Sequence, residues 1–289
     1  MSLTPASAGV EKVTPQTLLA HKRAGTAITA ITAYDCPAAR QADESGIDLI
    51  LVGDSLAMAV LGHPDTLSVT LAEMIHHAKA VRRGTRRALL AVDMPFGSYH
   101  VSVEDTLRNA IRLVKESGAE AVKLEGGLAQ TANVRALTAA QIPVIGHIGL
   151  TPQSLHPMGG FRVQGRTRSA ALQLADDALA LQAAGVIAIV LEGIPRELAA
   201  HITALVTVPT IGIGAGPDCD GQILVWHDLL QLTPPPAPKF VRAFADADTP
   251  IRRGLADYRS AVLARTFPSD SESYHAPNLA LDSATLTSR

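Results

Sequence analysis

The stretch EDTLRNAIRLVKESGAEAVKLEGGLAQTANVRALTAAQIPVIGHI (residues 104–148) decides the fold class of this chain. It begins with an amphipathic segment that runs to Gly118, and the short apolar run 121–124 follows at once. A second helical segment and a second apolar run, 143–148, repeat this order. Short apolar runs that alternate with longer amphipathic segments are typical of parallel strands joined by crossover helices. The stretch therefore predicts βα units whose strands are buried on both faces.

The same unit recurs along most of the chain. We expect strands at 27–32, 48–52, 89–92, 121–124, 143–148, 186–191, 210–213 and 240–243. Helices are expected between them, among others at 71–83, 104–117, 130–140, 170–184 and 195–206. Gly46, Gly118 and Gly185 fall where helices should end, a position that favours the left-handed conformation. Eight strands, most of them followed by a helix, predict an α/β fold, a single-domain (β/α)8 TIM barrel. An open doubly wound sheet is the alternative, because a strand count does not prove closure.

The length of 289 residues is compatible with one such barrel. We expect the barrel at 12–267, after an N-terminal extension at 1–11 and before a Ser-rich tail at 268–289. Two stretches interrupt the pattern. A Gly-rich loop at 149–169 is long enough to suggest a functional role, for example as a lid. The segment TPPPAP at 233–238 is interpreted as a stiff linker before the last strand.

Composition excludes several classes of function. A net charge of −2 and an aromatic content of 3% argue against a nucleic-acid partner, which calls for basic patches and stacking platforms. The sequence lacks a run of about 20 apolar residues and an N-terminal apolar core of the signal-peptide kind. We therefore expect no membrane association and a cytoplasmic location. Cys36 and Cys219 are the only cysteines, and they predict neither a disulfide framework nor a zinc site.

Ionisable side chains collect where the predicted strands end, which in a barrel is the rim that carries catalysis. They are Asp54, Asp93, Lys123, Glu125, His147 and Glu192. Carboxylates that converge on one point repel one another unless positive charge lies between them. Asp54, Asp93 and Glu125 therefore predict a hard divalent cation, and oxygen ligands favour Mg²⁺ over zinc. Capping of the following helix is the alternative role for Asp54 or Asp93 taken alone.

The remaining rim residues allow more than one interpretation. Glu192 ends the apolar run VIAIVLEG (186–193), and partial desolvation suits a carboxylate to proton transfer; an ion pair with Arg196 is the alternative. Lys123 lies inside a strand and needs an anionic partner, either Glu125 or a substrate carboxylate. His147 is either a core histidine or a functional one. The segment GIGAGP (212–217) is not GxGxxG, so we interpret it as a tight turn and not as a dinucleotide site.

A set of motifs resembles the ketopantoate hydroxymethyltransferase family. It comprises ITAYD (31–35), ILVGDSLAM (50–58), VDMPFGSY (92–99), VKLEGG (122–127), IPVIGHIGLTPQS (142–154), GGFRVQGR (159–166), VLEGIP (190–195) and GIGAGPDCDGQILVWHDLL (212–230). The resemblance covers about residues 12–270 in the expected order, and the combination is specific although each motif alone is weak. The family is similar in fold to the isocitrate lyase and phosphoenolpyruvate mutase barrels.

The resemblance implies transfer of a hydroxymethyl group from 5,10-methylenetetrahydrofolate to 3-methyl-2-oxobutanoate. The reaction would proceed through a Mg²⁺-stabilised enolate and give 2-dehydropantoate in pantothenate and coenzyme A biosynthesis. It also implies a ring-based homo-oligomer, such as a decamer. One departure is Gly193, where the family commonly has Cys.

By motif, Asp54 and Asp93 would ligate Mg²⁺, with Glu125 close to the metal. The resemblance further implies that Glu192 removes the proton from C3 of the substrate. The 2-oxo acid would be bound by Asp54, Ser55, Asp93, Lys123 and His147.

Two other functions use parts of the same site. A C–C lyase of the isocitrate lyase-like superfamily would act without tetrahydrofolate, which distinguishes it from the transferase. A catalytically silent 2-oxo acid sensor would not need the base Glu192.

Overall fold

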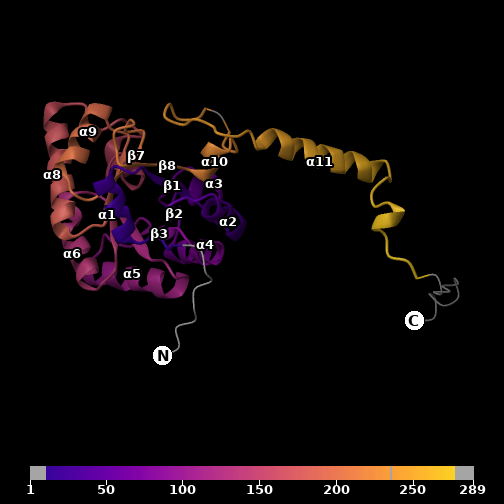
Figure 1. Cartoon of the computed structure of the whole chain (residues 1–289), viewed down its shortest axis with the longest axis horizontal. Coiled ribbons are helices and arrows are strands. Elements are labelled where there is room, and N and C mark those ends of the chain that lie inside the picture. Colours follow the sequence, from indigo (N-terminus) through magenta and orange to yellow (C-terminus); the bar gives the residue numbers. More distant parts are fainter. Residues whose placement is uncertain (1–10, 235, 277–289) are drawn as a thin grey trace.

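The computed structural model describes residues 11–234 and 236–276, and eight parallel strands close into a barrel at its centre (Figure 1). In chain order they are β1 (Ile28–Thr32), β2 (Leu49–Val52), β3 (Leu89–Asp93), β4 (Ala121–Glu125), β5 (Val144–Gly149), β6 (Ala188–Glu192), β7 (Thr210–Ile213) and β8 (Gly221–Leu224). Strand β1 pairs with both β2 and β8, so the sheet has no free edge. The closed pairing confirms the predicted (β/α)8 barrel over the open doubly wound sheet.

The last strand is not where the sequence predicted it. Strand β8 is Gly221–Leu224, whereas residues 240–243 form no strand, and the proline-rich segment follows β8 instead of preceding it. The prediction was wrong because it assigned no strand to the short run 221–224, which follows β7 after only seven residues. Residues 214–220 alone join β7 to β8, and they turn at Gly214 and Gly216 with φ values of 61° and 80°. These left-handed glycines confirm the tight turn expected for GIGAGP.

Helices surround the barrel on its outer side (Figure 1). In chain order, the α-helices of the described residues are α1 (Pro15–Ala24), α2 (Cys36–Glu44), α3 (Leu56–Ala59), α4 (Leu71–Gly84), α5 (Val103–Ser117), α6 (Thr131–Ala139), α7 (Leu155–Met158), α8 (Arg168–Ala184), α9 (Arg196–Leu205), α10 (Trp226–Leu229) and α11 (Asp248–Leu263). The five helices predicted by range agree with α4, α5, α6, α8 and α9 to within two residues at each end. Gly118 and Gly185 cap α5 and α8 in the left-handed conformation, and Gly46, also left-handed, follows the cap of α2.

Side chains alternate along each strand between the barrel interior and the helical layer. The inward positions form one apolar cluster and the outward positions another, which packs against the helices. On β3 the inward Ala91 is followed two residues later by Asp93, and on β5 Ile145 is followed by His147. The period of two thus places the ionisable residues of the strand ends directly above the apolar interior. The site is the top layer of the barrel core.

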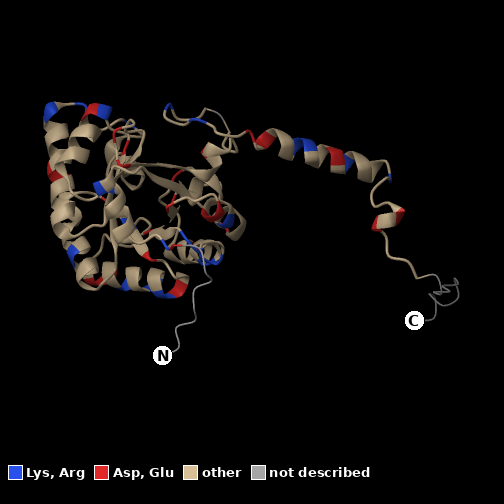
Figure 2. Ribbon diagram, in the orientation of Figure 1, with Lys and Arg blue, Asp and Glu red and all other residues tan. Residues whose placement is uncertain are grey.

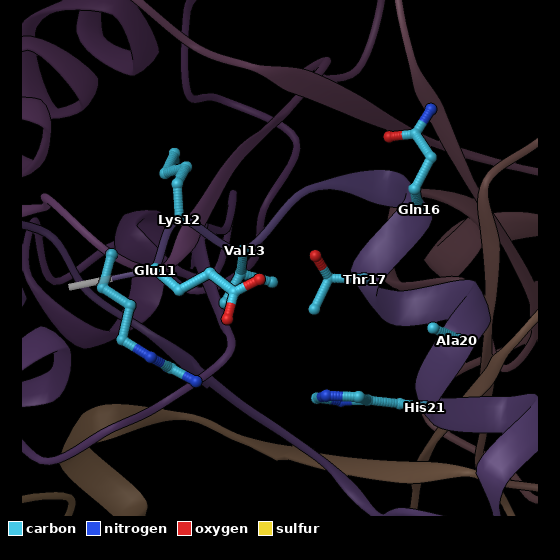
Figure 3. Close-up of a pocket in the computed structure, with 8 residues that line it drawn as sticks. Glu11, Lys12, Val13, Gln16, Thr17, Ala20 and His21 are labelled. Carbon is cyan, nitrogen blue, oxygen red and sulfur yellow. The ribbon is translucent and has the colours of Figure 1, made fainter. Parts of the chain in front are cut away.

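Helix α1 covers the opposite end of the barrel. Val13, just before it, and Leu18 within it are buried in the interior cluster. Beside α1 lies a surface hollow of about 640 Å³ (Figure 3). Its cations are already engaged, since Lys12 pairs with Glu120 at 2.6 Å and Arg87 with a second carboxylate at 2.8 Å. The positive charges of Lys12 and Arg87 are therefore balanced within the protein and are not available to bind an anionic ligand.

Helix α11 extends away from the barrel (Figure 1). None of its residues is buried. The helices around the barrel pack in the order α2, α4, α5, α6, α8, α9, and no comparable contact joins α9 to α2 among the described residues. The predicted extension at 1–11 and the tail at 268–289 fall largely outside those residues. Within the described chain, no helix has the length and apolar content needed to cross a membrane.

We predict that Gly84→Ala destabilises the barrel by about 1–3 kcal/mol, the usual cost of overpacking. A Cβ at Gly84, the last residue of α4, would lie 2.4 Å from the carbonyl oxygen of Cys36 in α2, so two backbones would have to separate. At Gly146 a Cβ would meet only the Cδ1 of Leu181, at 2.7 Å. Gly146→Ala should therefore cost less, because a side chain can move. Urea unfolding of both variants checks this, and equal losses would contradict it.

Candidate active site

A cavity of about 870 Å³ opens at the carboxyl ends of the strands. Its lining includes six of the seven residues predicted for the site, namely Asp54, Ser55, Lys123, Glu125, His147 and Glu192. The seventh, Asp93, is 2% exposed and connects to the lining through Lys123. Ser55 is further fixed by a hydrogen bond of 2.8 Å between its hydroxyl and that of Tyr34. The structure thus brings all seven predicted residues together.

Lys123 is buried among carboxylates. Its Nζ lies 3.0 Å from Oδ1 of Asp93, the residue paired with it across β3 and β4, and 3.1 Å from Nδ1 of His147. Burial alone would lower the pKa of Lys123, but the charges of Asp93, Glu125 and Asp54 outweigh it and raise the pKa above its usual value. The lysine therefore stays charged. Its direct partner is Asp93, not the Glu125 that the sequence suggested.

Asp54 and Asp93 carry negative charge that their surroundings only partly balance. Burial raises the pKa of Asp54 well above its usual value, and the charges of Asp93 and Glu125 raise it further. Burial also raises the pKa of Asp93, although Lys123 opposes this. Neither aspartate caps a helix, since α3 starts after Ser55 without a side-chain cap and Ser102 caps α5. The capping alternative is therefore wrong for both.

The donor set fits a hard cation in charge and in chemistry. Oδ1 of Asp93 and Oε1 of Glu125 are buried, and apart from their ion-pair contacts with Lys123 and His147 they accept no hydrogen bond from the described residues. Among those residues, no three His, Cys, Asp or Glu side chains are grouped closely enough to hold a metal ion by themselves. Mg²⁺ in proteins usually takes one or two carboxylates and completes its shell with water and substrate oxygens. The geometry accommodates that kind of site better than a cage of three carboxylates.

His147 links two carboxylates of the site. Its Nε2 lies 3.2 Å from Oε2 of Glu192, and its Nδ1 lies 3.4 Å from Oε1 of Glu125. Burial and the Lys123 charge lower the pKa of His147, but the two glutamates outweigh them and raise it to about 9. A neutral ring with its proton on Nε2 points a donor toward Glu192 and can accept a hydrogen bond from Lys123 at Nδ1. His147 thus lines the cavity and is in contact with its lysine and two of its glutamates.

Glu192 lies at the wall of the cavity, at the end of β6. Its side chain is 16% exposed, more than that of any other acid of the cluster, so it can reach a bound molecule. The expected alternative, an ion pair with Arg196, does not form, because Arg196 pairs with Asp218 at 2.8 Å. Glu192 is therefore a carboxylate that faces the cavity and has His147 as its near neighbour.

Two residues of the site were not predicted from the sequence. The buried Gln153 donates from Nε2 to Oδ2 of Asp54 at 2.7 Å, and its backbone N–H donates to Oε2 of Glu125 at 2.9 Å. Tyr99 donates its hydroxyl to Oε1 of Gln153 at 2.6 Å. Both residues occur in motifs that support the family resemblance, VDMPFGSY and IPVIGHIGLTPQS. Their roles depend on contacts across three strand ends, which no local pattern reveals.

Several solved structures share the fold of this chain. Phosphonopyruvate hydrolase, in a complex with oxalate and Mg²⁺, superposes with a TM-score of 0.58 over 89% of this chain and 92% of its own, at 17% identity. 2,3-Dimethylmalate lyase, a member of the phosphoenolpyruvate mutase/isocitrate lyase superfamily, gives 0.55 over 90% and 91%, also at 17% identity. At this level of identity the likeness concerns the fold alone.

Sequence relatives are much closer. The 3-methyl-2-oxobutanoate hydroxymethyltransferase of Koribacter versatilis is 58% identical over 92% of this chain and 90% of its own length. The enzyme of the same name from a Thermoanaerobacter species is 52% identical over 91% and 96%. The family model of ketopantoate hydroxymethyltransferase matches residues 12–270. The chain therefore belongs to the ketopantoate hydroxymethyltransferase family.

Proposed function

We propose that this chain transfers a hydroxymethyl group from 5,10-methylenetetrahydrofolate to 3-methyl-2-oxobutanoate, giving 2-dehydropantoate for pantothenate synthesis. The observation that carries the proposal is the pairing, within one cavity, of an accessible carboxylate with a buried lysine. Glu192 would take a proton, and Lys123 would attract an anionic acceptor, as their positions in the cavity lining support. The family assignment supports the choice of acceptor.

The residues of the cavity suit the proton transfer that the reaction needs. Glu192 would remove the proton from C3 of the acceptor, and the electron pair of the C–H bond would form the C2=C3 bond. Negative charge then develops on the 2-oxo oxygen. Water would add to the methylene carbon of the donor, whose two C–N bonds break as tetrahydrofolate leaves with a proton on each nitrogen. The electron pair of the C2=C3 bond would then form the bond from C3 to the released one-carbon aldehyde, and its oxygen would take the proton from Glu192 to become the hydroxyl. His147, 3.2 Å from Glu192, would hold the carboxylate in position and stabilise its charge.

The acid cluster would serve the 2-oxo group of the acceptor. We propose that Asp54 and Asp93 hold Mg²⁺, with Glu125 nearby, as the raised pKa values and the oxygens without hydrogen bonds suggest. When bound there, such a cation supplies Lewis acidity that polarises the 2-oxo group. Gln153 would keep Asp54 and Glu125 in place, since it bonds to both. Ser55 would contribute a hydroxyl to the acceptor.

We also propose that the protein assembles into a homo-oligomer in which α11 packs against a second copy. Ile251, Leu255, Tyr258 and Val262 are 42–64% exposed and are spaced to share one face of the helix. Charges of both signs lie along the same helix (Figure 2). A helix that buries nothing in its own chain gains little stability from packing, so its apolar face is best explained by a partner. A second copy is favoured because α9 and α2 do not close the helical layer.

We predict that Glu192→Gln lowers the rate of deuterium exchange at C3 of 3-methyl-2-oxobutanoate by about 10²–10⁴-fold, the usual contribution of a general base. Proton NMR with Mg²⁺ present measures the exchange without the folate. Glu197→Gln, at an exposed position of α9, is the control and should leave the rate unchanged. An unchanged exchange rate in Glu192→Gln would contradict the role of this residue as the base. If the wild-type protein forms no 2-dehydropantoate once the donor is added, a lyase or a sensor is favoured.

We predict that Asp54→Asn weakens binding of Mn²⁺, a paramagnetic substitute for Mg²⁺, by at least about 10–100-fold. Without metal, the same variant should be as stable as wild type or more stable, because a repelling charge is gone. Electron paramagnetic resonance measures the binding, and thermal unfolding measures the stability. Asp48→Asn, at the other end of the barrel where Asp48 pairs with Arg87, should bind the ion normally. Equal affinity in both variants would remove the metal site from Asp54.

We predict that the double variant Ile251→Glu, Leu255→Glu reduces the molar mass measured by light scattering after size exclusion. Two charges on the apolar face of α11 would have to be buried on assembly. Asp257→Ala is the control, since Asp257 is 73% exposed and pairs only within the helix, with Arg253. A wild-type monomer, or a double variant of unchanged mass, would show that α11 does not build the oligomer.

A further inference from the structure

The active-site cavity is larger than the acceptor requires. It measures about 870 Å³, near the upper end of the range for small-molecule sites, whereas the acceptor is a five-carbon acid. The ionisable residues discussed so far lie on the strand ends and occupy its deep part. The remaining space is bounded by segments outside the barrel strands, and these form the mouth of the cavity.

The mouth is lined by two segments that are distant in the sequence. Phe161, Arg162 and Val163 come from the loop after β5, and Lys239 and Phe240 come from the segment after β8. The rings of Phe161 and Phe240 are 52% and 39% exposed. All five phenylalanines of the chain are exposed, and two of them, from segments far apart in the sequence, line this one opening. Exposed aromatic side chains beside a cavity indicate a ligand with a flat apolar surface.

Contacts with the barrel hold both segments near the reacting part of the site. The backbone N–H of Gln164 donates to the carbonyl oxygen of Gly193 at 2.9 Å, which places the Phe161 segment next to Glu192. Phe240 packs on the turn after β7, since a Cβ at Gly214 would lie 2.8 Å from its Cδ1. A ligand between these rings would therefore extend from the base outward.

The mouth also carries positive charge without a partner in the protein. Besides Lys123 in the deep part, three cations line the cavity: Arg196 pairs with Asp218, whereas Arg162 and Lys239 form no ion pair with any described residue. Outside the deep cluster, the described lining also includes the acid Asp228, which accepts a hydrogen bond from Thr233 at 2.6 Å. The mouth thus has two exposed cations available for an anionic group.

We infer that the mouth is the binding subsite for the folate co-substrate. Phe161 and Phe240 contact its ring system, and Arg162 and Lys239 attract the carboxylates of its glutamate tail. The inference rests on the proposed function, and it adds the location of the donor and the chemistry that recognises it. A flat apolar body with an anionic tail matches the pairing of aromatic and cationic residues at the opening. The acceptor, small and held in the deep part, uses none of these four side chains.

The test measures dissociation constants of tetrahydrofolate and of tetrahydrofolate triglutamate by titration calorimetry on the full chain. Phe161→Leu and Phe240→Leu should each weaken binding of both forms by about two- to tenfold, because the ring contact is lost. Phe244→Leu, an exposed ring of the same C-terminal segment outside the cavity lining, is the control and should bind normally.

The double variant Arg162→Gln, Lys239→Gln should abolish most of the extra affinity of the triglutamate over the monoglutamate, together with its dependence on salt. Arg83→Gln, an exposed position on α4, is the matched control for charge. In all variants, C3 exchange of the acceptor and the KM for the acceptor should stay at the wild-type values, which shows that the deep part is intact.

The outcomes separate this inference from the proposed function. Suppose that the wild-type protein catalyses deuterium exchange at C3 and binds tetrahydrofolate, and that the variants bind tetrahydrofolate equally well. This result would overturn the subsite but not the proposed function. Wild-type protein that binds no tetrahydrofolate and forms no product would overturn both. Loss of affinity only in the Phe161, Phe240 and double variants supports the subsite.

Discussion

The ion pair between Lys123 and Asp93 is the interaction on which the site depends. Its two atoms are 3.0 Å apart, and the side chains are 5% and 3% exposed. A charge buried so deeply needs a close partner, and removal of one member of a buried pair costs about 3–5 kcal/mol. Around this pair the carboxylates outnumber the cations, which is why the pKa of Asp54 is raised. The top of the barrel is therefore a place where added positive charge is favourable.

The closed barrel makes this arrangement possible. The inward positions below the site are apolar, so the charged residues lie directly above a buried apolar layer. Electrostatic interactions are stronger in such surroundings than in water. Parallel pairing places Glu125 beside His147 and Asp93 beside Lys123, so each strand supplies one or two groups to a common centre. Gln153 and Tyr99 then fix the acids from the loops above. Strands position the reacting groups, and loops restrict their movement.

The chain departs from a regular barrel at its C-terminal end, and the departures concern the surroundings of the site more than the site. A turn of left-handed glycines replaces the helix after β7, and α11 projects outward in place of a helix packed beside β8. The segment between β8 and α11 brings Lys239 and Phe240 to the mouth of the cavity. Changes after β8 therefore alter what the cavity can admit and leave the charged layer intact.

The sequence by itself determined the βα repeat, the placement of Asp93, Lys123, His147 and Glu192 on the strands that meet at one rim, and the resemblance to the family. These follow from periodicity and from motifs, which are local properties. The tertiary structure alone decided closure of the sheet, the position of β8, and the partner of Lys123. It also decided the roles of Gln153 and Tyr99. All of these features depend on contacts between residues far apart in the chain. Several side chains of similar chemistry could make each contact, and only the packing of the folded chain determines which one does.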